Sequence, residues 1–130
     1  MAGTITAAVH DSGSAGVAPQ FAANGTQIGT LCVAWVNFNG VTTATVRASF
    51  NVSSVTRNGT GDYTINFTNT LTDANYSALV HTDGANSNGN PPYQHATYPI
   101  TSSSGFRFVV LTYNAGAFVD AAYACIAVFR

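Results

Sequence analysis

The stretch RNGTGDYTINF, residues 57–67, decides the fold of this chain. It opens with Asn58-Gly59, a dipeptide that tolerates the positive φ angles of a tight hairpin turn. From Asp62 on, hydrophobic and polar residues alternate, so that Tyr63, Ile65 and Phe67 share one face of a strand. The opposite face carries Asp62, Thr64, Asn66 and Thr68. We therefore expect a β-hairpin whose second strand has one buried face and one polar face.

Short β-rich segments separated by turn residues continue on both sides of this hairpin. We predict strands over residues 28–38, 42–50, 52–57, 62–68, 76–80, 106–113 and 121–129, with a further short strand at 5–9. No long window has a helical period that is free of Gly or β-branched interruptions. The pattern predicts an all-β antiparallel β-sandwich of about seven or eight strands over residues 28–130. Residues 1–27, rich in Ala, Gly, Ser and Thr, are expected to form an N-terminal arm or attachment segment.

Charge is scarce in this chain. Only 7% of the residues are charged, the formal net charge is −1, and neither Lys nor Glu occurs. Such a surface has no long-range field to attract nucleic acid or an anionic membrane, and it suits uncharged partners such as sugars or other proteins. No apolar run approaches the length of a membrane-spanning helix, so we expect no membrane insertion. The first six residues lack the pattern of a signal peptide.

The two cysteines, Cys32 and Cys125, each lie in an apolar, strand-like run. Because nothing in the sequence indicates an oxidising compartment, we expect two buried free thiols in preference to a disulfide.

Three stretches resemble the C-terminal receptor-binding domain of bacteriophage and prophage tail fibre proteins. They are AWVNFNG at 34–40, VRASFNVSSVTRNGTGDYTINF at 46–67 and the ending IAVFR at 126–130, within a resemblance that spans about residues 18–130. It implies a homotrimer on a virion, assembled in the bacterial host cytoplasm and bound to other tail or capsid proteins through its N-terminal segment. The chain departs from the family pattern at 41–45, where VTTAT replaces a turn like Gly-Thr-Gly, and residues 82–98 match nothing in it.

The order of segments after Gly61 is also similar to the H-type lectin sandwich. That likeness implies sugar clefts between protomers or in the loops at one end of the sandwich.

A long polar segment, residues 82–98, holds the best candidates for binding a ligand. Aromatic faces stack on the apolar faces of sugars, and amides bind hydroxyl groups in fixed directions. A Pro-stiffened loop of this length more often has a function than not, although its tyrosines could equally pack back onto the sandwich. The candidate receptor- or glycan-binding residues are Asp83, Asn88, Asn90, Tyr93, Gln94, His95 and Tyr98, with Asn114 in a nearby turn.

The sequence contains no recognisable catalytic motif and no metal-binding motif. Asp62 and Asp73 lie in expected turns, where turn stabilisation is their default role, and no nucleophile elbow, phosphate loop or Cys-x-x-Cys occurs. The three histidines, His10, His81 and His95, are scattered, and no calcium-loop pattern is present. We expect no catalytic residues, no metal and no cofactor.

The remaining aromatic residues are interpreted as core or subunit interface. They are Trp35, Phe38, Phe50, Phe67, Phe106 and Phe108. Phe106 and Phe108 share a strand face, and Arg107 points the other way. Taken together, the sequence predicts a distal tip module of a tail fibre that binds a host surface glycan or protein without catalysis. The alternatives are a structural virion protein, such as a capsid decoration or tail-adaptor subunit, and a fibre-linked hydrolase.

Overall fold

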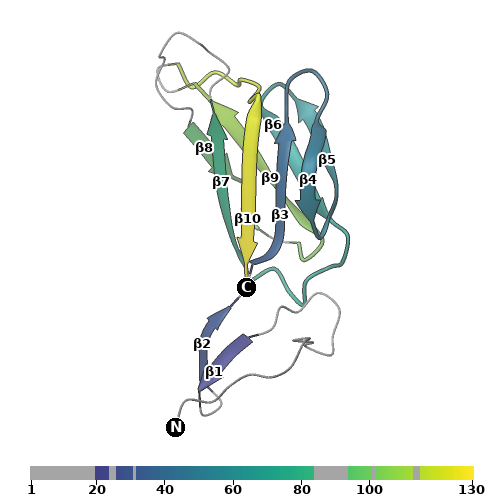
Figure 1. Cartoon of the computed structure of the whole chain (residues 1–130). Coiled ribbons are helices and arrows are strands. Elements are labelled where there is room, and N and C mark those ends of the chain that lie inside the picture. Colours follow the sequence, from purple (N-terminus) through teal and green to yellow (C-terminus); the bar gives the residue numbers. More distant parts are fainter. Residues whose placement is uncertain (1–19, 24–25, 31, 84–93, 101, 113–114) are drawn as a thin grey trace.

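The computed structural model describes residues 20–23, 26–30, 32–83, 94–100, 102–112 and 115–130, and these contain strands and loops but no helix. Two strands, β1 (Gln20–Ala23) and β2 (Thr26–Thr30), pair as a small separate sheet. The other eight form two four-stranded antiparallel sheets that face each other as a β-sandwich (Figure 1). The predicted fold class is therefore confirmed.

One sheet has the order β4-β3-β10-β7 and the other the order β5-β6-β9-β8. The first sheet consists of β3 (Cys32–Asn39), β4 (Thr45–Phe50), β7 (Ser77–Asp83) and β10 (Tyr123–Phe129). The second consists of β5 (Val52–Gly59), β6 (Asp62–Phe67), β8 (Gln94–Thr97) and β9 (Gly105–Leu111). We call them the β3 sheet and the β6 sheet after one central strand of each.

The core lies between the two sheets, and alternation along the strands supplies most of it. In β6, Tyr63, Ile65 and Phe67 are buried, as the sequence predicts. The rings of Phe38, Tyr63 and Phe108 pack with centroids 5.3 to 6.4 Å apart, which joins the two sheets through aromatic contacts. Phe67 and Phe106 are likewise buried, so four of the six aromatic residues assigned to core or interface lie in the core.

Trp35 and Phe50 do not belong to the core of the chain, since 40% and 55% of their surfaces are exposed. They lie on the outward face of the β3 sheet. Of the two places predicted for them, the core is therefore wrong, and the subunit interface stays a prediction. The two thiols are free, but the prediction that they are buried is wrong for both. Cys32 is half-buried, and Cys125 is exposed because β10 alternates and its inward positions are Ala124 and Ile126.

The central hairpin forms where it was predicted, but its turn lies two residues later. Gly59 pairs with Asp62, so the turn residues are Thr60 and Gly61, and Asn58-Gly59 belongs to β5. Gly61 takes φ +64°, and a Cβ atom there would lie 2.7 Å from the Val110 carbonyl oxygen and from backbone atoms of Val119. The positive φ angle and the facing backbone therefore require glycine at position 61.

Two further segment predictions need correction. The strand predicted over 28–38 is divided between β2 and β3, because the partner strand β10 reaches only as far as Cys32. The polar segment predicted over 82–98 is shorter than expected, since β7 continues to Asp83 and β8 begins at Gln94. The strand predicted at 5–9 lies outside the described residues.

Candidate functional site

A groove of about 350 Å³ lies on the outward face of the β6 sheet, beside the segment that follows β8. We call it the Tyr98 groove. It is lined by Thr64, Asn66, Tyr98, Pro99, Ser102, Ser104, Gly105, Phe106 and Arg107. Most of these side chains carry hydroxyl, amide or guanidinium groups, and one presents an exposed aromatic ring.

Alternation along β6 and β9 places the polar side chains in the groove. Because Tyr63 and Ile65 point into the core, Thr64 and Asn66 point outward. The strand register sets Thr64 opposite Arg107 and Asn66 opposite Gly105. At position 105 any Cβ atom would lie 2.1 Å from the Ile65 carbonyl oxygen, so only glycine fits here. Gly105 therefore lines the groove with backbone alone.

Arg107 connects the aromatic side of the groove to a carboxylate. Its guanidinium lies 4.7 Å from the centre of the Tyr98 ring, a cation–π distance. Its Nε donates a hydrogen bond to Asp62 Oδ1 at 2.8 Å, and its Nη2 bonds the second carboxylate oxygen. The hydrogen bond from Arg107 lowers the pKa of Asp62, so the pair stays ionised at neutral pH. The positive charge is thus balanced, and Tyr98 is held with 43% of its surface exposed.

Further hydrogen bonds fix the polar rim. The Asn66 amide donates to the hydroxyls of Ser54 and Thr56, each at 3.1 Å. At the other side, the Ser102 and Ser104 hydroxyls lie 2.8 Å apart. The rim is therefore organised before any ligand arrives.

Tyr76 anchors the Ser102 end of the groove from below. Its hydroxyl donates to the Gly105 carbonyl oxygen at 2.9 Å and lies 3.1 Å from the Ser102 carbonyl oxygen. Burial raises the pKa of Tyr76 to about 12, so this hydroxyl remains a donor over the whole physiological range.

The predicted binding residues separate in the structure. Tyr98 lines the groove, whereas Gln94 and His95 lie in β8 and do not line it. His95 Nδ1 lies 3.0 Å from the hydroxyl of the buried Thr82, and burial together with His81 lowers the pKa of His95. His95 therefore joins β8 to β7. Asp83 is the last residue of β7, and its side chain is outside what is described, as are Asn88, Asn90, Tyr93 and Asn114.

The groove adds residues that the loop hypothesis missed. They are Thr64, Asn66, Ser102, Ser104 and Arg107. The sequence signal was the polar face of the strand at 62–68, because its hydroxyl and amide side chains alternate with the aromatic core. That pattern identifies an outward face, but it does not show which residues from elsewhere in the chain border it.

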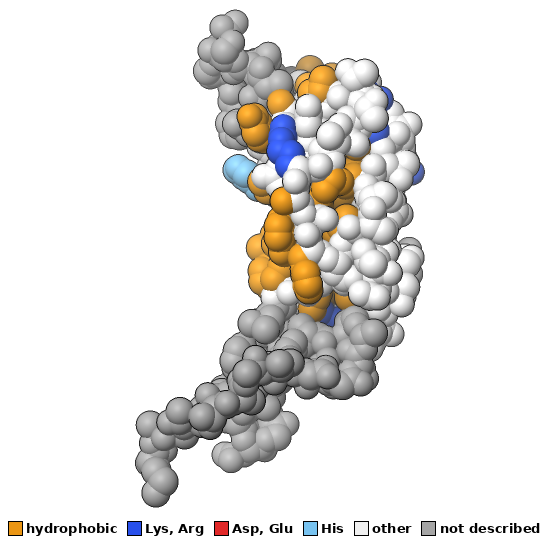
Figure 2. Space-filling view, turned by 45° about the vertical axis from the view of Figure 1, so that its right-hand side comes forward, with side chains coloured by type: hydrophobic (Ala, Val, Ile, Leu, Met, Phe, Trp, Pro, Cys, Tyr) orange, Lys and Arg blue, Asp and Glu red, His pale blue; other side chains and the backbone are white. Residues whose placement is uncertain are grey.

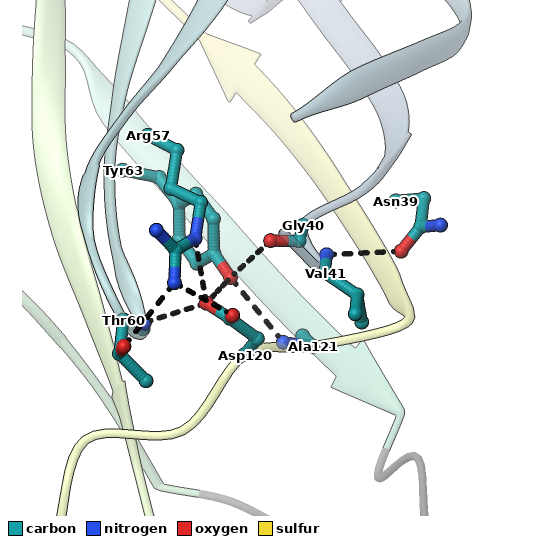
Figure 3. A network of polar contacts seen from close by, with 9 residues as sticks. Asn39, Gly40, Val41, Arg57, Thr60, Tyr63, Asp120 and Ala121 are labelled. Carbon is teal, nitrogen blue, oxygen red and sulfur yellow. Dashed lines mark hydrogen bonds and ion pairs between the residues drawn. The ribbon is translucent and has the colours of Figure 1, made fainter. Parts of the chain in front are cut away.

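A second polar cluster, centred on Asp120, has a structural role (Figure 3). Asp120 accepts two hydrogen bonds from Arg57, at 2.8 and 3.1 Å, one from the Gly61 amide at 2.8 Å and one from the Tyr63 hydroxyl at 2.9 Å. Burial alone would raise the pKa of Asp120, but these bonds lower it to about 2. The donors come from both strands of the β5–β6 hairpin and from its turn, so the cluster ties this hairpin to the segment before β10.

The two aspartates expected in turns differ in their roles. Asp73 accepts a hydrogen bond from the backbone N–H of Asn75 at 2.8 Å, which confirms turn stabilisation. It also forms an ion pair with Arg130. Asp62 instead begins β6 and pairs across the sheet with Arg107.

In the part of the chain that the structure describes, no three His, Cys, Asp or Glu side chains are grouped closely enough to hold a metal ion. The same residues include no helix long and apolar enough to span a membrane. Comparisons with protein-family models, curated proteins and solved structures find no match to this chain.

Proposed function

We propose that this chain is the distal module of a virion fibre and that it binds a host-surface saccharide in the Tyr98 groove, without catalysis. The observation that carries the proposal is the placement of an exposed tyrosine ring beside a row of ordered hydroxyl and amide groups. Saccharides offer an apolar ring face and a rim of hydroxyls, which match these two elements.

The charge of the groove indicates the kind of saccharide. Arg107 is bonded to Asp62 through both carboxylate oxygens, so neither charge is left for a charged ligand. A neutral sugar fits this balance better than an acidic one, because an acidic group would compete with Asp62 for the guanidinium. The same pairing leaves Asp62 without the free or shared proton that a hydrolase needs for acid–base chemistry.

Binding to one groove is expected to be weak, and repetition compensates for it. We include in the proposal that the chain assembles as a homotrimer and docks to other tail or capsid proteins through its N-terminal segment. Several weak sites on one rigid tip raise the overall affinity without any new contact. The alternative of a structural virion subunit is supported by the exposed apolar face of the β3 sheet, which suits a protein neighbour.

Substitution of the aromatic ring tests the site. Tyr98→Ala should weaken binding of soluble neutral oligosaccharides about tenfold, or about 1.4 kcal/mol, as measured for each site by NMR titration. Tyr123→Ala is a matched control, because Tyr123 lies on the opposite sheet with an arginine guanidinium 4.3 Å from its ring. Equal weakening by both changes, or saccharide binding that Tyr98→Ala leaves intact, would overturn the assignment of the groove.

Particles carrying the same change separate the two functional candidates. Loss of adsorption to host cells by intact particles supports receptor binding. Defective particle assembly supports the structural alternative instead.

A further inference from the structure

Asn58, near the end of β5, is hydrogen-bonded to two residues at the Tyr98 groove although it does not line the groove itself. Its side-chain Nδ2 donates to Asp62 Oδ1 at 3.0 Å and to Thr64 Oγ1 at 2.9 Å. Both hydrogens of the amide are therefore used. β5 is an edge strand of the β6 sheet, and Figure 2 shows that the side toward the β4–β5 edge is mostly polar, next to a band of hydrophobic side chains.

The Asp62 carboxylate determines which way the Asn58 amide faces. A side-chain amide can present either its oxygen or its NH2 group to a neighbour, and a hydroxyl neighbour accepts both arrangements. Arg107 donates to both oxygens of Asp62 and lowers the pKa of this carboxyl group, so at neutral pH Asp62 can only accept. The NH2 group of Asn58 must therefore point at Asp62, and its second hydrogen is directed to Thr64.

The direction of this second bond determines what the Thr64 hydroxyl offers to a ligand. Because Thr64 Oγ1 accepts from Asn58, the hydroxyl keeps its own hydrogen. Among the described residues this hydrogen has no acceptor, and Thr64 is one of the residues that line the groove. A ligand in the groove therefore meets a hydroxyl that is ready to donate.

Arg107 adds donors directly beside Thr64. The two residues are opposite each other in the register of β6 and β9, which places their Cβ atoms about 5 Å apart. Nε and Nη2 of Arg107 bond Asp62, and Nη1 has no hydrogen-bond partner within the described part of the chain. A guanidinium group contains no acceptor. Both of these neighbouring residues therefore offer hydrogens to a ligand.

We propose that Asn58 is a positioning residue that keeps Thr64 and Arg107 as a pair of hydrogen-bond donors, and that the groove selects its ligand through two neighbouring acceptor oxygens. Oxygens on adjacent carbons of a saccharide ring have this arrangement, whether they are hydroxyl or ether oxygens. The inference rests on the proposed function for the saccharide nature of the ligand. The donor pair follows from the direction of the bonds among Asn58, Asp62 and Thr64.

Two small probes that differ in whether their oxygens can donate test the donor pair in the wild-type chain. Cyclohexane-1,2-diol has two neighbouring oxygens that donate and accept, whereas the oxygens of 1,2-dimethoxycyclohexane only accept. Both probes should shift the NMR signals of Thr64 and Arg107, with dissociation constants within about threefold of each other. Shifts with the diol alone would overturn the proposal, because they would show that the groove needs a donating ligand. The absence of shifts at these residues with both probes would also overturn it.

Asn58→Asp should reverse the direction of the bond to Thr64. A carboxylate at position 58 only accepts, so the Thr64 hydroxyl turns its hydrogen toward it and keeps none for the ligand. Relative to the diol, the diether should then bind about fivefold more weakly than it does to the wild type. Asn58→Ala is the matched control, because it removes the bond without reversing it and should keep the wild-type ratio of the two dissociation constants.

The same ratio in all three chains would contradict the positioning role of Asn58. A loss of folding would weaken both probes together, and the comparison of the two probes on the wild type does not depend on any variant. Titration with neutral oligosaccharides separates this inference from the proposed function. If the probes behave as expected and no neutral oligosaccharide binds, the proposed function fails and the donor pair stands. If an oligosaccharide binds in the groove and the diether does not, the donor pair fails and the proposed function stands.

Discussion

Tyr98 and Tyr123 show how the surroundings of a residue determine what it can do. Each has an arginine guanidinium near its ring, at 4.7 Å from Arg107 and 4.3 Å from Arg47. Tyr98 is surrounded by hydroxyls and an amide in a groove, and its arginine is balanced by Asp62. Tyr123 lies on the outward face of the β3 sheet, in the same strand as Cys125 and Ala127, and its arginine contacts no carboxylate among the described residues but bonds the Ala122 carbonyl and the Asn37 side chain. The same pair of residue types therefore lies in a polar groove in one place and on an outward sheet face in the other.

Asp120 should control the acid stability of the fold. Its pKa in the folded protein is about 2, below the usual 3.8, so its ionised form stabilises the fold above about pH 4, and that stabilisation is lost as the pH falls toward 2. Asp120→Asn should cost roughly 1 to 3 kcal/mol at pH 7 and flatten the fall in stability between pH 4 and 2, as measured by urea unfolding. The pKa of Asp73 is also lowered to about 2, through its pair with Arg130, so Asp73→Asn should remove a second, separate part of the same fall, and the two effects should add in the double variant. An unchanged pH profile in Asp120→Asn would contradict this role.

At the scale of elements, the sequence predicts most of the strands because alternation is strong in them. Tyr63, Ile65 and Phe67 are buried as expected, and so are Phe106 and Phe108 with Arg107 outward. The failures occur where contacts from distant segments decide the outcome. The hairpin turn lies at Thr60 and Gly61, where Gly61 bonds Asp120 and Val110 of distant segments. The N-terminal pair β1 and β2 was missed although Asn24-Gly25, a hairpin dipeptide, lies between the two strands in the sequence.

Gly61 and Gly59 should respond differently to substitution by alanine. Gly61→Ala introduces a side chain at φ +64° and 2.7 Å from backbone atoms of the facing segment, so we expect a loss of at least about 2 kcal/mol in the free energy of unfolding. Gly59→Ala meets no atom within 4 Å and should change it by less than about 0.5 kcal/mol. Chemical denaturation of both variants makes the comparison. Similar losses for the two would show that the close approach at Gly61 does not exist in solution.

On the scale of the whole molecule, the sandwich has two outward faces of opposite character. The β6 sheet presents Thr64, Asn66 and Arg107, whereas the β3 sheet presents Trp35 and Leu79. The sequence could predict the sandwich, and it names Tyr98 as one of eight candidate binding residues. It could not predict the groove, because its members come from β6, β9 and the segment after β8, which only the fold brings together. Nor could it place Trp35 and Phe50, since an outward apolar residue and a core residue look alike in a strand pattern.

The most direct test of the central claim is to map a bound neutral oligosaccharide by NMR on the isotope-labelled chain. Binding in the groove predicts amide shift changes confined to Thr64, Asn66, Tyr98 and residues 102–107, with the β3 sheet unaffected. Changes concentrated on the face of Trp35 and Leu79, or no changes with any neutral sugar while an acidic one binds, would contradict the account.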